Sequence, residues 1–229
     1  MKQFVTLTEF KFNSFQSKLW AFFMMQFAHQ SLSKVQGQEF YKLFGSGKSN
    51  FNPFPDWSTY AILQTWKSKE DATNFFEKSQ LYKRYRQQSK QHKIIEMQPI
   101  QSRGLWNSKN PFRFKSSEIS NTPSDSKIAV ITRASIKPSK LLEFWKAVPN
   151  SQKPLQNAVD LIYTKGYGEV PFFEMATFSL WKSIEGLNKF AYQSQEHVNV
   201  IKKTRQINWY SEELFARFRV LDIKKITST

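Results

Sequence analysis

The spacing of hydrophobic and polar positions changes along this chain in an order that occurs twice. Residues 4–12 (FVTLTEFKF) and 128–136 (IAVITRASI) alternate as half-buried strands do. After each come a helical stretch, two further strands, a second helix and a closing strand, at 94–101 in the first half and 213–223 in the second. Both halves therefore predict the order strand, helix, strand, strand, helix, strand.

The two halves also share residues at matching positions. Residues 60–90 align with residues 175–205 without a gap, and the matching pairs are Trp66 with Trp181, Ser68 with Ser183, Glu70 with Glu185 and Phe75 with Phe190. Each Ser is placed to cap a helix N-terminus, where a following Glu is also favourable. We therefore expect an α+β fold of two tandem ferredoxin-like repeats that pair as a pseudo-dimeric α/β barrel.

The same pattern gives the domain boundaries. Residues 1–106 form the first repeat and residues 128–229 the second, while 107–127, rich in Ser, Asn and Pro, read as a linker. Gly45 and Gly47 are expected to make a tight turn with positive φ before the central strand of the first half, and Gly166 and Gly168 stand at the matching place in the second half. No G-x-S-x-G or H-E-x-x-H motif occurs, and the glycines lack phosphate-loop spacing.

Composition narrows the chemistry. The 229 residues include no cysteine, which excludes disulfides and all thiolate-bound metal centres. Lys and Arg number 34 against 18 Asp and Glu, so the net charge is +16, typical of proteins that meet nucleic acid or anionic membranes. The basic run at 83–93, with Tyr82 and Tyr85 beside it, is compatible with either partner.

The most apolar stretch is Leu19 to Ala28 (LWAFFMMQFA), about half of the ~20 residues that span a bilayer. We expect this aromatic helix to pack into the core, with a position in the plane of a membrane surface as the alternative. The first ten residues lack the apolar region of a secretory signal, so we expect a cytoplasmic protein.

Histidine is scarce, with three copies at positions 29, 92 and 197. We expect His29 and His92 to be structural or solvated. His197 shares one helical face with Phe190, Ser194 and Ile201, which are spaced by 4, 3 and 4 residues. That face is expected to point inward, and two interpretations stay open: a core histidine with satisfied hydrogen bonds, or an axial haem ligand.

A series of ordered residue blocks carries a resemblance to one family. The blocks are KLWA (18–21), FYKLFGSG (40–47), WSTYAILQTW (57–66), SRGLW (102–106) with PF (111–112), IAVITRASI (128–136), FW (144–145) with VP (148–149), GYGEVP (166–171), TFSLW (177–181), FAY (190–192), His197 and WYSEELFARFRV (209–220). Over nearly its full length, the chain resembles the spheroidene monooxygenase family of carotenoid-modifying enzymes.

This resemblance implies a haem b monooxygenase that uses O2 and electrons from a donor such as ferredoxin to place a keto or hydroxy group at C-2 of an acyclic carotenoid. It implies an iron ligand on a helix of the second repeat, which here is His197, with Phe190 and Ile201 beside the haem. Arg103 and Arg133 are the cations we would assign to the haem propionates, because Arg pairs bidentately with carboxylates; ordinary ion pairs are the alternative.

The resemblance also orders the partners. A carotenoid is insoluble in water, so we expect the basic protein to dock peripherally on an anionic membrane surface rather than on nucleic acid. Another haem enzyme of the same barrel type, such as a dehydratase, a peroxidase or a haem-degrading enzyme, is the alternative function. A nucleic-acid-binding module is the least favoured.

Overall fold

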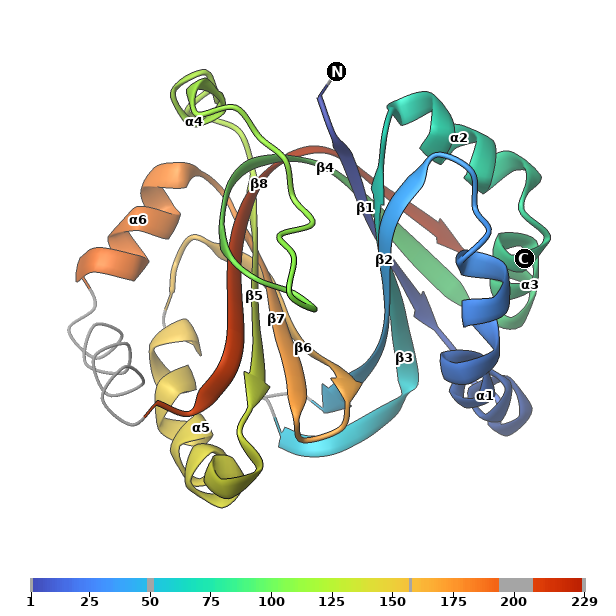
Figure 1. Cartoon of the computed structure of the whole chain (residues 1–229), viewed down its shortest axis with the longest axis horizontal. Helices are drawn as coiled ribbons and strands as arrows, with labels where there is room; N and C mark the ends of the chain where they lie inside the picture. Colours follow the sequence, from blue (N-terminus) through green and yellow to red (C-terminus); the bar gives the residue numbers. More distant parts are fainter. Residues whose placement is uncertain (1, 49–51, 157, 194–207, 228–229) are drawn as a thin grey trace.

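The strands of the chain close into a barrel that carries its helices on the outside (Figure 1). A computed structural model describes residues 2–48, 52–156, 158–193 and 208–227. The first half comprises β1 (Phe4–Lys11), α1 (Phe15–Leu32), β2 (Gln38–Lys48), β3 (Asn52–Trp66), α2 (Lys69–Lys78), α3 (Gln80–Gln88) and β4 (Gln91–Gly104). After the short helix α4 (Ser117–Ser120), the second half comprises β5 (Ile128–Ile136), a 3₁₀ turn (Pro138–Lys140), α5 (Leu141–Gln156), β6 (Leu161–Val170), β7 (Glu174–Trp181), α6 (Ile184–Gln193) and β8 (Tyr210–Thr227).

The strand order around the barrel is β1-β3-β2-β6-β7-β5-β8-β4, with antiparallel neighbours throughout the described residues. Each half contributes four adjacent strands in an equivalent order, and two seams join the halves. The β4–β8 seam is long, from Gln91 opposite Thr227 to Gly104 opposite Leu214. The β2–β6 seam pairs only residues 45–46 with 167–168 in the described ranges. The predicted α/β barrel architecture is confirmed.

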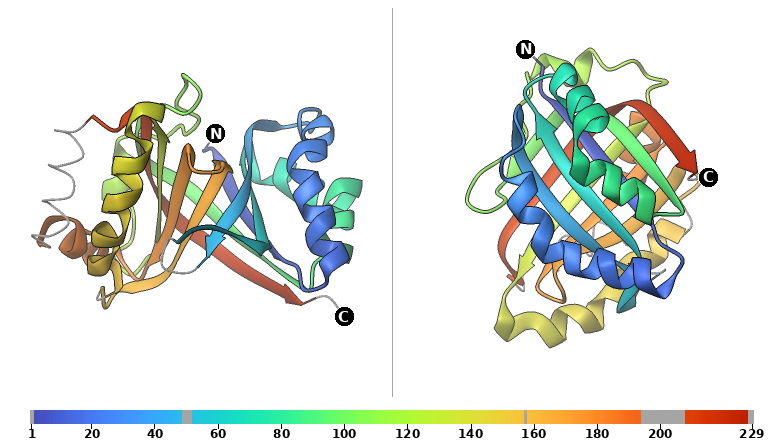
Figure 2. Two further views of the ribbon diagram at one scale, coloured as in Figure 1. Left: turned by 90° about the horizontal axis from the view of Figure 1, so that it is seen from below. Right: turned by 90° about the vertical axis from the view of Figure 1, so that its right-hand side faces the viewer.

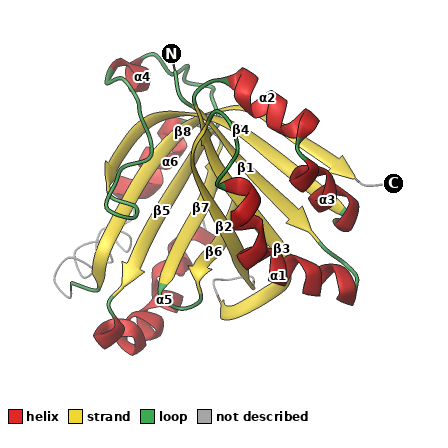
Figure 3. Ribbon diagram, turned by 45° about the vertical axis from the view of Figure 1, so that its right-hand side comes forward, coloured by secondary structure: helices red, strands yellow, loops and turns green. Residues whose placement is uncertain are grey.

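Alternation along the strands separates an interior from an exterior. On β1, Val5 and Leu7 point into the barrel and belong to one apolar cluster that includes residues from all seven of the remaining strands. Thr6 and Thr8 point outward and are buried by helices. Helices α1, α2 and α3 cover one flank and α5 and α6 the opposite flank (Figures 2 and 3). The barrel core therefore lies between two helical layers.

Local signals in the sequence place the paired helices correctly. The Ser68 hydroxyl accepts a hydrogen bond from the Asp71 N–H at 3.2 Å, and the Ser183 hydroxyl accepts one from the Gly186 N–H at 3.1 Å. Both predicted N-caps are confirmed. Trp66 and Trp181, the matching tryptophans before these caps, are both fully buried.

The predicted glycine turn is wrong. Gly45 and Gly47 lie inside β2, where the register to β3 shifts at each of them, and neither has a positive φ. The irregular pairing of a β-bulge occupies the place where we expected a turn. Within the described ranges, Gly37 and Gly104 are the glycines with positive φ. At Gly104 a Cβ would lie 2.2 Å from the Glu213 carbonyl oxygen, so only glycine fits there.

The polar segment expected to be a linker also reaches the barrel core. Trp106 and Phe112 are buried in the interior cluster, where the Trp106 ring packs at 5.4 Å from Phe40 and 6.0 Å from Phe44. The beginning of the connection between the halves therefore fills part of the barrel.

Helix α1 does not pack as we expected. Its small residues Ala21 and Ala28 face the barrel, while Phe15, Phe23 and Phe27 are exposed. None of the helices within the described ranges combines the length and apolar character that crossing a bilayer requires.

Candidate functional site

The outer faces of the two halves differ in how completely helices cover them. On β1 the outward residues Thr6, Thr8 and Phe10 are all at most 1 % exposed beneath the helices of the first half. On β5, the matching strand of the second half, Thr132 is exposed and Ala134 is half-buried. Within the described residues, the second half therefore has a sheet face that is exposed around Thr132 and Ala134, which we call the outer strand face.

Helix α6 borders this face on one side. The Phe190 ring lies 5.0 Å from the ring of buried Trp181, and Leu187 is buried against Ile128 and Val130. Phe190 is thus where the sequence predicted it, on the side of α6 that faces the sheet. The described part of α6 ends at Gln193, and His197 and Ile201 lie outside the described residues.

Helix α5 borders the second half on another side. The Phe144 ring lies 5.7 Å from Trp209 and 6.0 Å from Tyr210, at the start of β8. The Trp145 indole N–H donates to the Phe172 carbonyl at 3.3 Å. Aromatic contacts therefore fix α5 to the ends of the strands without filling the outer strand face.

Two arginines flank this face on β4 and β8. Arg103 is exposed, and its guanidinium lies 5.4 Å from the centre of the Phe215 ring. Arg217, which the sequence analysis missed, lies at the same distance from that ring but is only 9 % exposed. Its Nε has no hydrogen-bond partner in the described part of the chain. A buried cation with an unused donor can receive a carboxylate, such as a propionate of a planar cofactor.

Arg133 lies on the other side of the same sheet, inside the barrel. It is 1 % exposed and forms ion pairs with Glu169 and Glu174 at 3.5 Å and with Glu212 at closer range. Burial alone would raise the pKa of Glu212, but hydrogen bonds from two backbone N–H groups and the Arg133 charge outweigh it and lower this pKa. The structure therefore does not bring Arg133 together with Arg103 and Phe190.

A second polar cluster inside the barrel connects the two halves. The Glu9 carboxylate accepts hydrogen bonds of 2.5 Å from both the Tyr163 and Tyr167 hydroxyls, and Lys93 lies 3.3 Å from it. Burial raises the pKa of both tyrosines, so they hold their protons at neutral pH. The sequence signal that could have predicted this cluster is Glu9, a charged residue that alternates in phase with the apolar Val5 and Leu7.

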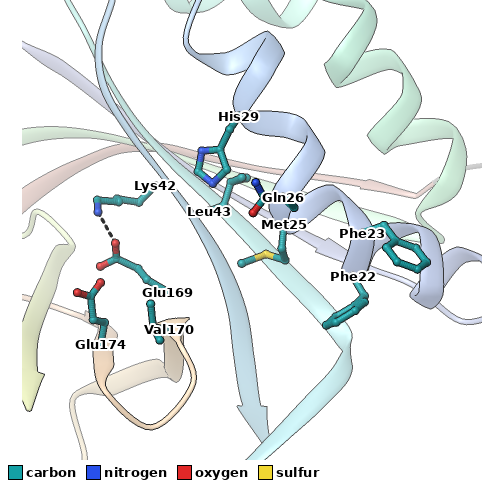
Figure 4. Close-up of a pocket in the computed structure, with 10 residues that line it drawn as sticks. All are labelled: Phe22, Phe23, Met25, Gln26, His29, Lys42, Leu43, Glu169, Val170 and Glu174. Carbon is teal, nitrogen blue, oxygen red and sulfur yellow. Dashed lines mark hydrogen bonds and ion pairs between the residues drawn. The ribbon is translucent and has the colours of Figure 1, made fainter. Parts of the chain in front are cut away.

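A cleft of about 450 Å³ lies between the halves at the short β2–β6 seam (Figure 4). Phe22, Phe23 and Met25 of α1 form its apolar side. Its polar side carries the ion pair between Lys42 and Glu169. Since Glu169 also accepts a 2.7 Å hydrogen bond from buried Trp106, the cleft reaches the edge of the barrel interior.

The other two histidines are distant from the outer strand face. His92 lies on β4, is 2 % exposed, and its Nε2 forms a 2.9 Å hydrogen bond with the Tyr82 hydroxyl. Burial, aided by the Arg86 charge, lowers its pKa to about 4. His29 is exposed on α1 and contacts the Tyr41 hydroxyl at 3.0 Å. Both belong to the first half.

Comparison with known proteins gives relatives over nearly the whole chain. The chain is 32 % identical over 217 residues to the spheroidene monooxygenase of Rhodobacter capsulatus, which covers 94 % of this chain and 89 % of that protein. It is 34 % identical over 222 residues to the spheroidene monooxygenase of Cereibacter sphaeroides, covering 96 % and 67 %. A third spheroidene monooxygenase, from Rubrivivax gelatinosus, is 30 % identical over 191 residues, covering 83 % and 72 %. No protein-family model matches the chain.

Among solved structures, two crystal structures of aldoxime dehydratase are similar, with TM-scores of 0.67 and 0.65. Each covers the whole of this chain, and the matches span 83 % and 85 % of those chains. Sequence identity is 10 % in both, so the likeness concerns the fold alone.

Proposed function

Because this chain belongs to the spheroidene monooxygenase family, we propose that it is a monooxygenase that introduces a keto group at C-2 of an acyclic carotenoid. The observation that carries this proposal is the 32 % identity to the Rhodobacter capsulatus enzyme over 94 % of the chain. Each oxygen insertion consumes one O2, two electrons and two protons and releases one water. Two insertions at one carbon give a geminal diol, which loses water to form the ketone.

We further propose that haem b binds at the outer strand face. The support from the structure is the open face at Thr132, bordered by Phe190, and the buried Arg217 with its unpartnered Nε. In this proposal His197 ligates the iron, Phe190 and Ile201 form apolar contacts, and Arg103 and Arg217 pair with the propionates. Arg133, already neutralised by three carboxylates, has its role inside the barrel.

Bound haem would supply the activation of O2, with electrons from a donor such as ferredoxin. The chain would supply position and surroundings. The sheet beneath the outer strand face is rigid, because β5 is hydrogen-bonded to β7 and β8 along its length. The Phe190 and Trp181 rings would exclude water from that side of the site.

We also interpret the two halves as tandem ferredoxin-like repeats from one duplicated unit. Support comes from their equivalent strand orders and from the matching tryptophan and N-cap serine in each half. In this interpretation, α6 corresponds to α2, and the second copy has been opened for a cofactor.

The reaction is tested by expressing the chain in a host that makes an acyclic carotenoid and analysing the extracted pigments. We expect a new pigment with a carbonyl at C-2. An unchanged pigment profile in cells that contain the folded, haem-loaded protein would contradict the proposed reaction. Turnover of an aldoxime or a peroxide supplied as substrate would instead favour another haem enzyme.

The haem site is tested separately by absorption spectroscopy of the purified protein. Wild type and the control variant His29→Ala are expected to show a Soret band, and His197→Ala is expected to lose it while keeping its circular dichroism spectrum. A Soret band that survives in His197→Ala would move the ligand elsewhere in the chain.

A further inference from the structure

Helix α1 presents its large apolar side chains to solvent. Phe15 is 76 % exposed, Phe23 50 % and Phe27 65 %, whereas the residues that face the barrel are small, such as Ala21 and Ala28. Trp20 packs at 4.9 Å from the Tyr85 ring and Leu32 is buried, but Phe15, Phe23 and Phe27 gain little from contacts within the chain. So many adjacent exposed aromatics indicate an interaction surface.

This surface continues onto three other elements. The Phe22 ring of α1 lies 5.2 Å from Trp57 of β3, which is 51 % exposed. Val170, at the end of β6, lies across the cleft from Phe22. The β6–β7 turn then contacts α5, since Phe172 lies 6.0 Å from the Trp145 ring. Figure 1 shows the beginning of α1, the β6–β7 turn and α5 at its lower end. We call the exposed members of this surface the apolar belt: Phe15, Phe22, Phe23, Phe27, Trp57, Val170 and Phe172.

The backbone at Phe172 supports a role for its side chain. Phe173 N–H donates to the Val170 carbonyl at 3.2 Å, which closes a four-residue turn with Pro171 second and Phe172 third. Phe172 has a φ of 71°, a conformation that such turns normally give to glycine or asparagine. A bulky side chain is strained there, and Phe172 is nevertheless 39 % exposed. Its contact with the Trp145 ring covers only part of the side chain, and the rest faces solvent.

Charges of both signs lie around the apolar belt, but the neighbouring carboxylates of Asp56, Glu143, Glu169 and Glu174 are all paired with cations. Helix α1 contains no acidic residue among its 18. Lys11 at the end of β1, Lys90 whose N–H donates to the Lys11 carbonyl, Lys48 at the end of β2 and Lys146 beside Trp145 are all exposed. None of these four lysines forms an ion pair with another described residue.

We propose that the apolar belt docks on the surface of a lipid bilayer with anionic headgroups. Aromatic side chains insert at the boundary between headgroups and hydrocarbon, and surrounding lysines attract negative headgroups. This pairing of exposed aromatics with unpaired cations fits a bilayer better than a second copy of the chain, which would bring the same lysines against one another. The inference does not depend on the proposed reaction, because lipid binding is measured without a carotenoid.

The test is co-sedimentation of the full chain with vesicles of phosphatidylcholine containing phosphatidylglycerol, and with vesicles of phosphatidylcholine alone. We expect binding to the anionic vesicles that weakens as salt is added. The double variant Phe23→Gln, Phe27→Gln is expected to lower the partition coefficient about tenfold. Leu221→Gln, a matched change of a residue that is 43 % exposed on β8, is expected to leave it unchanged.

Phe172→Asn gives a second, sharper readout. Asparagine accepts a positive φ, so this variant is expected to be at least as stable to urea as wild type while binding anionic vesicles several-fold more weakly. A residue with a purely structural role would not combine these two effects.

Three outcomes would overturn the proposal. One is wild type that remains in the supernatant with both kinds of vesicle. Another is a belt variant that binds as wild type does. The third is a stable dimer in solution that the belt variants convert to monomer, since a second copy would then occupy the belt.

Discussion

Arg133 forms ion pairs with more carboxylates than any other residue among the described ranges. Its guanidinium is 1 % exposed and holds three carboxylates, from β6, β7 and β8. We expect Arg133→Leu to lower the free energy of unfolding by about 3–5 kcal/mol, because three carboxylates then lose the buried cation that they share. Urea denaturation measures this loss. Arg103→Leu, at an exposed position, is the control and is expected to cost less than about 1 kcal/mol; equal effects would contradict the structural role of Arg133.

His92 makes stability depend on pH in a defined window. Its pKa falls to about 4 through burial, helped by the Arg86 charge, against 6.5 in the unfolded chain. Between these values the unfolded state binds a proton that the folded state does not. Stability should therefore be complete above pH 6.5 and decline as the pH falls toward 4, by up to about 1.4 kcal/mol for each pH unit.

Urea denaturation at pH 7 and pH 5 tests this window, which lies above the range in which Asp56 titrates, since hydrogen bonds from Ser58 and Lys165 overcome its burial and hold its pKa at about 2. His92→Gln should reduce the difference between the two pH values, whereas His29→Gln should preserve it. A pH difference unchanged in His92→Gln would show that another group causes it.

Single residues differed in how well the sequence predicted them. The N-cap serines could be predicted because a cap needs only the three residues that follow it. The partners of Arg133 could not, because Glu169, Glu174 and Glu212 reach it only through strand pairing across the barrel. Arg217 could not be singled out because Phe215, Arg217 and Arg219 all fall on the same side of the strand. The alternating pattern does not tell which of the two arginines is buried.

The N-cap of α6 can be compared with that of its matching helix, α2. Both α2 and α6 begin at a Ser whose hydroxyl accepts a backbone N–H. At the Ser68 cap, the hydroxyl also donates to the Asp71 carboxylate at 2.9 Å, and α2 is followed at once by α3. We expect Ser183→Ala to cost about 1 kcal/mol in the free energy of unfolding, measured with urea.

If α6 borders a haem, Ser183→Ala should also weaken the Soret band, and Ser68→Ala should not. A loss of stability in both variants with unchanged haem content would separate α6 from the cofactor site.

Helix α1 shows the limit of periodicity as evidence. The spacing identifies residues that share a face, but aromatic residues occur around most of this helix, so the pattern does not state which face is buried. The tertiary structure decides it: Ala21, Ala28 and Leu32 are buried against the first-half core, and Trp20, Met24 and Met25 are partly buried beside them. The turn predicted from Gly45 and Gly47 was wrong for a related reason: a β-bulge and a turn both favour glycine, so the glycines alone do not distinguish them.

The barrel as a whole has unequal seams, which predicts unequal protection. The β4–β8 seam pairs residues along both strands, while the described part of the β2–β6 seam pairs Gly45 with Gly168 and Ser46 with Tyr167. We expect amide hydrogens in peptides covering 45–46 and 167–168 to exchange faster than those at Ile95 and Ile223, measured by deuterium exchange and mass spectrometry. Equal protection would contradict this difference.

The unequal seams also indicate where the two halves can separate. Breaking the two residue pairs of the β2–β6 seam would move α1 away from the β6–β7 hairpin, while the β4–β8 seam stays intact. The Lys42–Glu169 ion pair crosses the β2–β6 seam, so it would break in the same movement. The size of a molecule that can pass between the halves then depends on these two strand pairs, on the ion pairs Lys42–Glu169 and Lys165–Asp56, and on the hydrogen bonds from Tyr163 and Tyr167 to Glu9.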